Sequence, residues 1–269
     1  MLLAFDVGNT HVVFGLFQGS NLLNSWRLQS DVNRTVDEYA LEVLGLVERF
    51  LRERSASFGQ ECFDNSPSSN ITAIVICCVV PPLTRVFSKF AQKYFGFEAL
   101  VVRSDSFPDM PIHTDNPRAV GADRLVNAYA ARESFGSPAI IIDMGTATTF
   151  DIVGVDGAYE GGIIAPGLNI SAQALFSRAA MLPSIQIKHP DHLIGKNTTE
   201  AMLSGIVYGY VGLVDGIVSR LRTQLKAQNI QVIGTGGLIA LIADDLQFFN
   251  KTVPDLTLQG LRLLAHHCQ

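Results

Sequence analysis

The sequence predicts an α/β protein built from two duplicated lobes, each with a mixed β-sheet flanked by helices. Short apolar runs typical of strands alternate with amphipathic stretches of helical spacing along the 269 residues. One pattern also occurs twice, about half a chain length apart. In each copy an apolar run reaches an aspartate, a glycine follows two residues later with a threonine close behind, and a second apolar run leaves. Such a repeat indicates an internal duplication, so two equivalent lobes would face one another across a shared ligand.

The two copies of this pattern begin at Asp6 and at Asp143. Each predicts a strand, a tight turn and a second strand, and the turn offers backbone N–H groups, hydroxyls and one carboxylate with little side-chain bulk. These groups can hold a polyphosphate and its metal ion. A single copy could equally be a plain hairpin turn, but two copies half a chain apart favour a nucleotide site.

Composition limits the class of protein and the kind of partner. With 48% hydrophobic and 17% charged residues, we expect a soluble globular protein with a sizeable core. The formal net charge of -5 argues against a nucleic-acid partner, which would favour a basic face. No uninterrupted apolar run reaches the length of a membrane span, and Asp6 interrupts the apolar start, so we expect neither a membrane segment nor a signal peptide.

The four cysteines show no metal-binding spacing. Cys77 and Cys78 lie within an apolar run, so we expect buried thiols. The reducing cytoplasm is the natural compartment for such a chain.

In the first lobe, strand and helix signals alternate after the opening hairpin. Thr35 and Glu38 have the spacing of a capping box, so a helix should begin there and continue to about Arg54. The Ser-, Asn- and Gly-rich stretch 55–70 predicts a surface loop. The other expected elements are a strand at 21–28, a strand at 71–80 ended by Pro81-Pro82, a helix at 83–95 and a strand at 99–102.

A connection with three prolines, 104–118, follows, and we place the lobe boundary at its end, which gives lobes 1–118 and 119–269. Gly121-Ala122-Asp123-Arg124 then opens a helical stretch. Asp123 has two interpretations. It can cap the helix N-terminus, or it can be a general base aimed at the ligand, with Arg124 beside it for an anionic substrate.

In the second lobe, glycines mark places where the backbone can approach a ligand closely. Paired glycines and a Pro-Gly turn lie in 159–167, and the glycines at 234–237 follow a strand and precede an expected helix, a usual site for an anion. Gly195-Lys196 lacks the frame of a Walker motif, and Thr198 or Thr199 can simply cap the helix 200–226. The remaining expected elements are a helix at 168–179, an extended stretch at 181–188 and a helix at 254–265.

Taken together, these motifs resemble the superfamily of acetate and sugar kinases, Hsp70 and actin, and within it the type III pantothenate kinases. The resemblance covers nearly the whole chain, and no single motif is specific alone. It rests on Asp6–Thr10, Gly121–Arg124, Asp143–Thr149, Gly161–Gly167, Leu182-Pro183, Ile194–Thr198 and Gly234–Gly237.

This resemblance implies ATP-dependent phosphorylation of the primary hydroxyl of pantothenate to 4′-phosphopantothenate, the first step toward coenzyme A. It implies two ribonuclease-H-like lobes with the active site in the cleft between them. It also implies a cytoplasmic homodimer that needs Mg²⁺ and a monovalent cation, K⁺ or NH4⁺.

The resemblance also implies roles for the residues that match the family's motifs. Asp123 would accept the hydroxyl proton, Asp6 would organise Mg²⁺ through water, and Asp143 would bind the monovalent cation. The residues expected to contact ATP are Asp6, Val7, Gly8, Asn9, Thr10, His11, Val12, Val13, Thr146, Gly234 and Gly236. Those expected to contact pantothenate are Gly121, Ala122, Asp123, Arg124 and, across a dimer interface, Thr198.

One position departs from the family's pattern. Thr114 stands where a tyrosine is usual, a few residues before the Gly-Ala-Asp-Arg motif, so an aromatic wall of the substrate pocket is missing or comes from elsewhere. Two other functions stay open: a non-catalytic nucleotide-binding accessory factor of transcription, and a kinase of the same superfamily for another small substrate. A pure binding protein has no need of a base at Asp123, and substrate turnover separates the two kinases.

Overall fold

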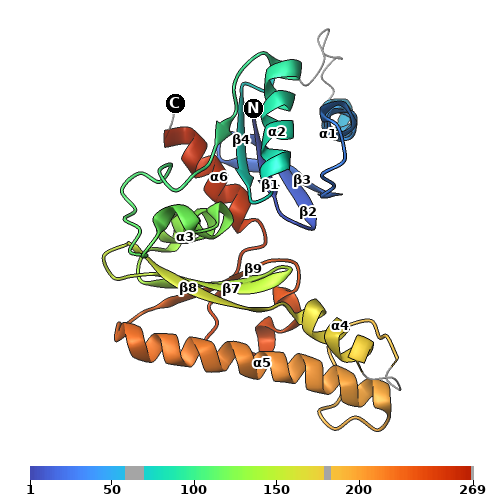
Figure 1. The fold of residues 1–269 in the computed structure, drawn as a ribbon, viewed down its shortest axis with the longest axis vertical. Coiled ribbons are helices and arrows are strands. Elements are labelled where there is room, and N and C mark those ends of the chain that lie inside the picture. Colours follow the sequence, from blue (N-terminus) through green and yellow to red (C-terminus); the bar gives the residue numbers. More distant parts are fainter. Residues whose placement is uncertain (58–69, 179–182, 268–269) are drawn as a thin grey trace. The chain divides into compact units, whose positions relative to one another are not determined.

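The computed structural model describes residues 1–57, 70–178 and 183–267, drawn as a ribbon in Figure 1. The chain divides into two compact units. The first unit comprises Met1–Pro108, Arg118–Val126 and Thr257–Gln269, and the second comprises Asp109–Pro117 and Asn127–Leu256. The lobe ranges 1–118 and 119–269 stay a prediction. Most of the predicted loop 55–70, and Leu182, lie outside the described residues.

The sheet of the first unit contains five strands in the order β3-β2-β1-β4-β5. The first three strands pair antiparallel, whereas β4 and β5 are parallel to β1 and to each other. The sheet is therefore mixed, as predicted. Its strands are β1 (Leu2–Val7), β2 (His11–Gln18), β3 (Asn21–Gln29), β4 (Ala73–Cys78) and β5 (Leu100–Val101).

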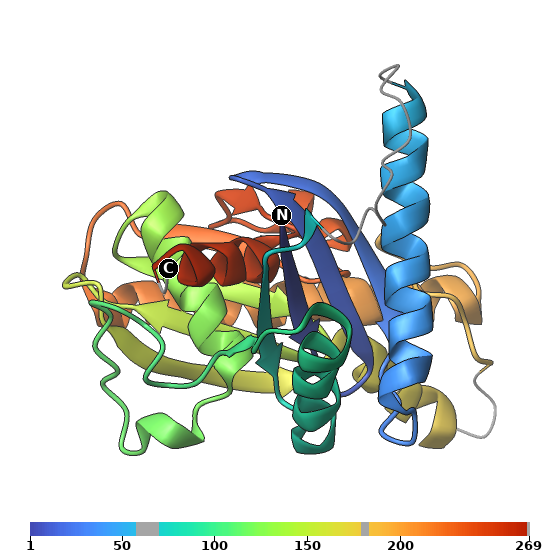
Figure 2. The same cartoon turned by 90° about the horizontal axis from the view of Figure 1, so that it is seen from above.

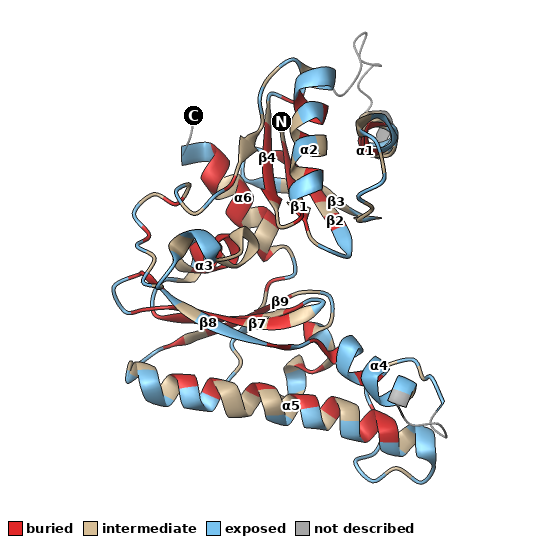
Figure 3. Ribbon diagram, viewed as in Figure 1, coloured by how far each residue is buried: buried red, intermediate tan, exposed pale blue. Residues whose placement is uncertain are grey.

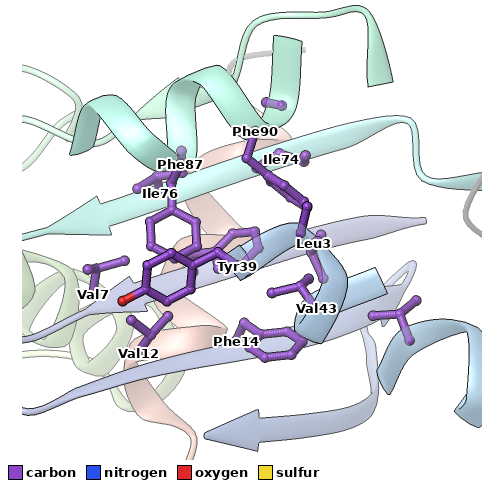
Figure 4. Close-up of a cluster of buried hydrophobic side chains, with 14 of the residues drawn as sticks. Leu3, Val7, Val12, Phe14, Tyr39, Val43, Ile74, Ile76, Phe87 and Phe90 are labelled. Atoms are coloured by element: carbon purple, nitrogen blue, oxygen red, sulfur yellow. The ribbon is translucent and has the colours of Figure 1, made fainter. Parts of the chain in front are cut away.

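One face of this sheet forms the core of the first unit with two helices, α1 (Val36–Ser57) and α2 (Pro81–Phe95). Alternate residues of a strand point to the same face, and Phe14 of β2 packs there in the same cluster as Tyr39 of α1 and Phe87 of α2. Figure 4 shows these aromatic rings gathered between the helices and the sheet. The two helices lie side by side in Figure 2, and each buries one apolar stripe.

The opposite face of the first sheet receives the last helix, α6 (Leu256–His267). Gly15 of β2 points away from Phe14, and a Cβ atom at this glycine would lie 2.9 Å from Cδ1 of Leu258. The absence of a side chain at position 15 therefore lets α6 pack closely onto the strand. Helices from both ends of the chain thus cover the first sheet.

The sheet of the second unit repeats this topology. Its order is β10-β9-β6-β7-β8, with an antiparallel meander of β6, β7 and β8 and with β9 and β10 parallel to β6. Each strand therefore has a counterpart in the first unit, which confirms the predicted duplication and the two-lobe α/β fold. The strands are β6 (Ala139–Met144), β7 (Ala147–Val153), β8 (Tyr159–Pro166), β9 (Gln231–Thr235) and β10 (Lys251–Thr252).

The 28-residue helix α5 (Thr198–Leu225) packs on this second sheet through a buried stripe that includes Val207, Val214 and Val218. Figure 3 shows buried and exposed residues alternating along it. It is the one helix among the described residues that is long and apolar enough to cross a membrane by length and composition, with a mean hydropathy of 1.6 and 39% of that window buried. It packs on the second sheet along one stripe and leaves the rest of its surface exposed or half-buried. Asp215 divides the apolar part of this helix, so the sequence contains no uninterrupted apolar run there of the length of a membrane span.

Several helix ends differ from the prediction. Pro81 does not only end a strand but is the first residue of α2, where its missing N–H costs no helical hydrogen bond. Asn197, not Thr198 or Thr199, caps α5, and its Oδ1 accepts the Glu200 N–H at 3.0 Å. The residues after the glycines at 234–237 form short 3₁₀ turns, Ile239–Leu241 and Ala243–Asp245, instead of the expected helix.

The predicted capping box at the start of α1 is confirmed. The Thr35 N–H donates to Oε2 of Glu38 at 2.7 Å, and the Glu38 N–H donates to Oγ1 of Thr35 at 3.3 Å. Replacing Thr35 by Ala should lower the free energy of unfolding by about 1 kcal/mol, because a free N–H of the first turn loses its partner. Urea denaturation followed by circular dichroism measures this.

Thr223→Ala is the matched control. Thr223 is exposed to solvent and lies within α5, away from the N-terminus of the helix, and its hydroxyl donates to the carbonyl of Ser219. Its free energy of unfolding should stay within about 0.5 kcal/mol of the native value. Equal denaturation midpoints for Thr35→Ala and the native protein would show that the cap contributes no stability.

Candidate active site

The first predicted phosphate turn joins β1 to β2 in the first unit. Asp6 lies half-buried near the end of β1, and the polar residues Asn9, Thr10 and His11 are exposed. The turn is closed by a hydrogen bond from the Gly8 N–H to the His11 carbonyl at 3.0 Å. Ser30 holds it from outside, since its hydroxyl donates to the Gly8 carbonyl at 2.5 Å. The result is a short, fixed turn that presents polar groups to solvent.

Asp123 lies in the same unit, in the first turn of helix α3 (Ala122–Phe135). Because the helix begins at Ala122, Asp123 is not the N-cap residue. Its carboxylate still binds one N–H group of the first turn, as a capping residue would, because Oδ1 accepts the N–H of Arg124 at 2.9 Å. A Cβ atom at Gly121 would lie only 2.5 Å from this oxygen. The glycine at position 121 thus leaves the room that the Asp123 carboxylate occupies.

Burial is the main cause that raises the pKa of the Asp123 carboxyl above its usual value, and hydrogen bonding to the Arg124 N–H and the positive charge of Arg124 act in the opposite direction. A carboxylate with a raised pKa is a stronger base as long as it is ionised. The general-base interpretation of Asp123 therefore has electrostatic support.

The structure relates Asp123 to Asp6 through Cys77, which is the direct neighbour of Asp6 across the parallel pair β1 and β4. Burial raises the pKa of the Cys77 thiol well above its usual value, and the charges of Asp6 and Asp123 raise it further. Both carboxylates therefore lie close enough to interact with the same buried thiol. Asp6 and Asp123 thus belong to the same unit, and the charges of both act on the Cys77 thiol.

The second predicted turn, between β6 and β7, lies in the second unit. Nδ2 of Asn127 donates to Oδ2 of Asp143 at 3.0 Å. The other oxygen, Oδ1, faces the backbone of Gly236, where a Cβ atom would lie 2.7 Å away. Gly236 has a φ of +88°, a backbone conformation that L side chains rarely adopt. The sequence assigns Asp143 to the cation and Gly236 to ATP, and the two residues lie next to one another in the structure, while both roles stay predictions.

The Pro166-Gly167 turn approaches the same β6–β7 turn. A Cβ atom at Gly167 would lie 2.1 Å from the carbonyl oxygen of Thr146, so no other residue fits there without a backbone shift. Gly234, in contrast, is buried against Ile239 and Phe249, and its small size is explained by packing. Its predicted contact with ATP stays a prediction.

The donor set around Asp143 fits a monovalent cation. The carboxylate oxygen Oδ1 lies where a side chain at 236 would otherwise stand, and the main-chain carbonyls of Gly145 and Thr146 belong to the β6–β7 turn that follows Asp143. Oxygen atoms of carboxylates and main-chain carbonyls are the ligands that K⁺ takes in proteins. The carboxylate of Asp6, beside an open polar turn, likewise fits a hard divalent ion such as Mg²⁺.

Two predicted substrate positions, Thr114 and Thr198, belong to the second unit, whereas Gly121–Arg124 belong to the first. Thr198 is the exposed first residue of α5. Thr114 follows a segment that is bonded to the edge of β8, through the His113 N–H and the Tyr159 carbonyl at 2.8 Å. The Thr114 hydroxyl is buried without a hydrogen-bond partner among the described residues.

Sequence reasoning missed Asn127, the residue that holds Asp143. A signal was present, because Asn127 is a polar residue within an otherwise apolar part of α3. Sequence reasoning also missed an exposed group formed by His113, Asp156 and Glu160, in which Nδ1 of His113 lies 3.1 Å from Oε1 of Glu160. Exposed groups of this kind are common without a metal, and the contact between His113 and Glu160 is an ordinary surface hydrogen bond.

Comparison with known proteins places these features in a family. A family model described as type III pantothenate kinase matches residues 2–220. A type III pantothenate kinase of Geotalea daltonii is 46% identical over 264 residues, which cover 98% of this chain and 97% of that protein. The corresponding protein of Moorella thermoacetica is 43% identical over 264 residues, which cover 98% of each chain.

Solved structures share the fold at low sequence identity. A Campylobacter jejuni protein described as a Baf family transcriptional activator superposes with a TM-score of 0.55 and 17% identity, covering 99% of this chain and 98% of that one. A Sinorhizobium meliloti protein described as a 2-dehydro-3-deoxygalactonokinase superposes with a TM-score of 0.52 and 13% identity, covering 99% and 96%. At these identities the likeness supports the two-lobe fold alone.

Proposed function

Since this chain belongs to the family of type III pantothenate kinases, we propose that it transfers the γ-phosphoryl group of ATP to the primary hydroxyl of pantothenate. The product is 4′-phosphopantothenate, and the reaction is the first step of coenzyme A synthesis. The observation that carries the proposal is the buried carboxylate of Asp123 in the first turn of α3. Burial raises its pKa and so makes the ionised carboxylate a stronger base, and it lies in the same unit as Asp6.

In the proposed mechanism, the hydroxyl oxygen of pantothenate bonds to the γ-phosphorus of ATP, and Asp123 accepts the proton that this hydroxyl loses. The bond between that phosphorus and the bridging oxygen breaks, and ADP leaves. Such transfers depend on positioning and on stabilisation of charge, more than on covalent chemistry by the protein. The turn at Asp6–His11 supplies backbone N–H groups and hydroxyls for the phosphates, and Arg124 supplies a positive charge for the substrate carboxylate.

Kinases of this family use ATP with a divalent metal ion, here assigned to Asp6 through water. When bound, Mg²⁺ neutralises charge on the phosphates. We assign the monovalent cation, K⁺ or NH4⁺, to Asp143 because of the oxygen donors beside Gly236. Thr146 and Gly236 are assigned to the nucleotide.

We also propose that the enzyme is a cytoplasmic homodimer assembled through α5. Cβ atoms at Gly205, Gly209 and Gly212 would meet nothing within 4 Å, so this stripe of the helix is open to close packing by a second copy. Thr198, exposed at the start of the same helix, would then contact pantothenate bound to the partner. Light scattering on the purified protein measures the mass that this proposal predicts.

The test of the proposed function is the release of ADP by the purified protein with millimolar ATP, Mg²⁺ and K⁺, with and without pantothenate. The proposal predicts that release requires pantothenate and falls when Na⁺ replaces K⁺. A folded protein that binds ATP but releases no ADP with pantothenate would instead favour an accessory factor or another substrate.

The pH dependence of turnover follows from the environment of Asp123. A general base must be deprotonated, and burial raises the pKa of this carboxyl, so kcat should fall as pH decreases through a value above the usual range for aspartate. The measurement is kcat at saturating substrates across acidic pH, with protein stability checked at each point. A kcat that stays constant down to about pH 4, near the ordinary pKa of aspartate, would contradict this assignment.

A further inference from the structure

The buried amide of Asn127 has no role in the mechanism so far. Asn127 is 1% exposed and lies in α3 among Leu125, Val126 and Ala128, which are fully buried. Burying a side-chain amide among apolar residues costs free energy unless the amide is hydrogen-bonded. The bond that it makes is therefore informative about why an amide stands at this position.

This amide holds the carboxylate to which we assign the monovalent cation. Nδ2 of Asn127 donates to Oδ2 of Asp143 at 3.0 Å, and the acceptor is a group that is ionised in the cation-binding form. The bond joins two different elements, since Asn127 lies on α3 and Asp143 lies near the end of β6. The side chain of Asp143 is thus oriented by an element other than its own strand.

The bond also determines how the carboxylate of Asp143 is presented to a ligand. With Oδ2 facing Asn127, Oδ1 faces the glycines: a Cβ atom would lie 2.7 Å away at Gly236 and 3.7 Å away at Gly145. A partial rotation of the carboxylate would break the bond to Asn127, whereas a half-turn only exchanges two equivalent oxygens, so the amide fixes the plane in which one oxygen is directed toward the glycines. A neutral amide is suited to this position, because it donates a hydrogen bond without adding negative charge beside Asp143.

We propose that Asn127 is a positioning residue for the monovalent cation: its amide fixes the Asp143 carboxylate so that Oδ1 is directed toward the cation position beside Gly145 and Gly236. This inference rests on the proposed function, in which Asp143 binds K⁺. Hydrogen bonds to the ligands of a metal ion orient them, and their loss typically reduces metal affinity by roughly 10–100-fold.

The test uses Asn127→Ala, Asp143→Ala and the double variant, with the K⁺ concentration for half-maximal activity as the first readout. Asn127→Ala should raise this concentration by roughly 10–100-fold, while the KM for pantothenate stays close to native. In the Asp143→Ala background, the same change at Asn127 should have no further effect on the response to K⁺, because the residue acts through Asp143.

A second readout does not depend on turnover. The melting temperature of the native protein should rise with KCl more than with NaCl at equal ionic strength, because K⁺ binds the folded state. Asn127→Ala should shift this rise to higher KCl. Asn250→Ala is the matched control, since it also removes an amide, here one whose Oδ1 accepts the Val232 N–H at 2.7 Å, and it should leave the K⁺ response unchanged.

If Asn127→Ala does not fold, Asn127→Thr keeps a polar side chain of similar volume whose hydroxyl is too short to reach Asp143. A native K⁺ response in every folded variant at position 127 would overturn the inference and leave the proposed kinase intact. A native enzyme that phosphorylates pantothenate without any response to K⁺ would overturn the cation assignment, and the inference with it.

Discussion

Replacing Asp123 by Asn should lower kcat for the phosphorylation of pantothenate by roughly 10²–10⁴-fold, the usual contribution of a general base. The amide cannot accept the hydroxyl proton, but it has nearly the shape of the carboxylate and its oxygen can still accept the N–H of Arg124. The fold and the affinity for ATP should therefore stay near native. Steady-state ADP release gives kcat, and calorimetric titration with a non-hydrolysable ATP analogue gives the affinity.

Asp105→Asn is the matched control for this variant, because Asp105 is an exposed aspartate of the same unit. It should turn over at the native rate. If Asp123→Asn also kept the native kcat, Asp123 would have no part in proton transfer, and the buried carboxylate would be explained by its hydrogen bond at the start of α3 alone.

Replacing Asp143 by Ala should abolish the dependence of the enzyme on K⁺, so that the remaining rate is the same in K⁺ and in Na⁺. The reason is that the variant lacks the charged ligand that we propose for the cation, whereas main-chain carbonyls alone provide no net charge. Initial rates over a titration of KCl against NaCl, at constant ionic strength, measure the effect.

The control for Asp143→Ala is Asp156→Ala, which removes an exposed carboxylate from the same unit and should respond to K⁺ as the native enzyme does. Activation of Asp143→Ala by K⁺ would mean that the cation binds elsewhere. Normal melting of both variants would show that the loss of activation does not come from unfolding.

Features that depend on neighbouring residues could be predicted from the sequence. The hairpins that begin at Asp6 and Asp143 need only apolar runs and a small turn, and both are present. The capping box of Thr35 and Glu38 is a property of four consecutive residues. Gly121 stands where a side chain would meet the carboxylate of Asp123, two residues further along the chain, so the choice of glycine there also follows from a close neighbour.

Other features could not be predicted, either because they depend on residues distant in sequence or because local signals compete. The bond between Asn127 and Asp143 joins a helix to a strand end, and no local pattern specifies that contact. The cap of α5 was assigned to a threonine, because hydroxyl residues and asparagine compete for this position and only the backbone direction decides. The turns after Gly237 were expected to be a helix, since their apolar residues fit either structure.

The first unit contains the start of the chain, but it is completed only by the last residues to be synthesised. Residues Asn127–Leu256 form nearly all of the second unit, whereas the first unit needs Thr257–Gln269, with Leu258 against Gly15 of β2. A nascent chain can therefore close its later unit while one face of its earlier sheet is still exposed. Until α6 has been synthesised, the surface that Leu258 covers stays exposed, and transiently exposed apolar surface of this kind promotes aggregation and favours the binding of chaperones.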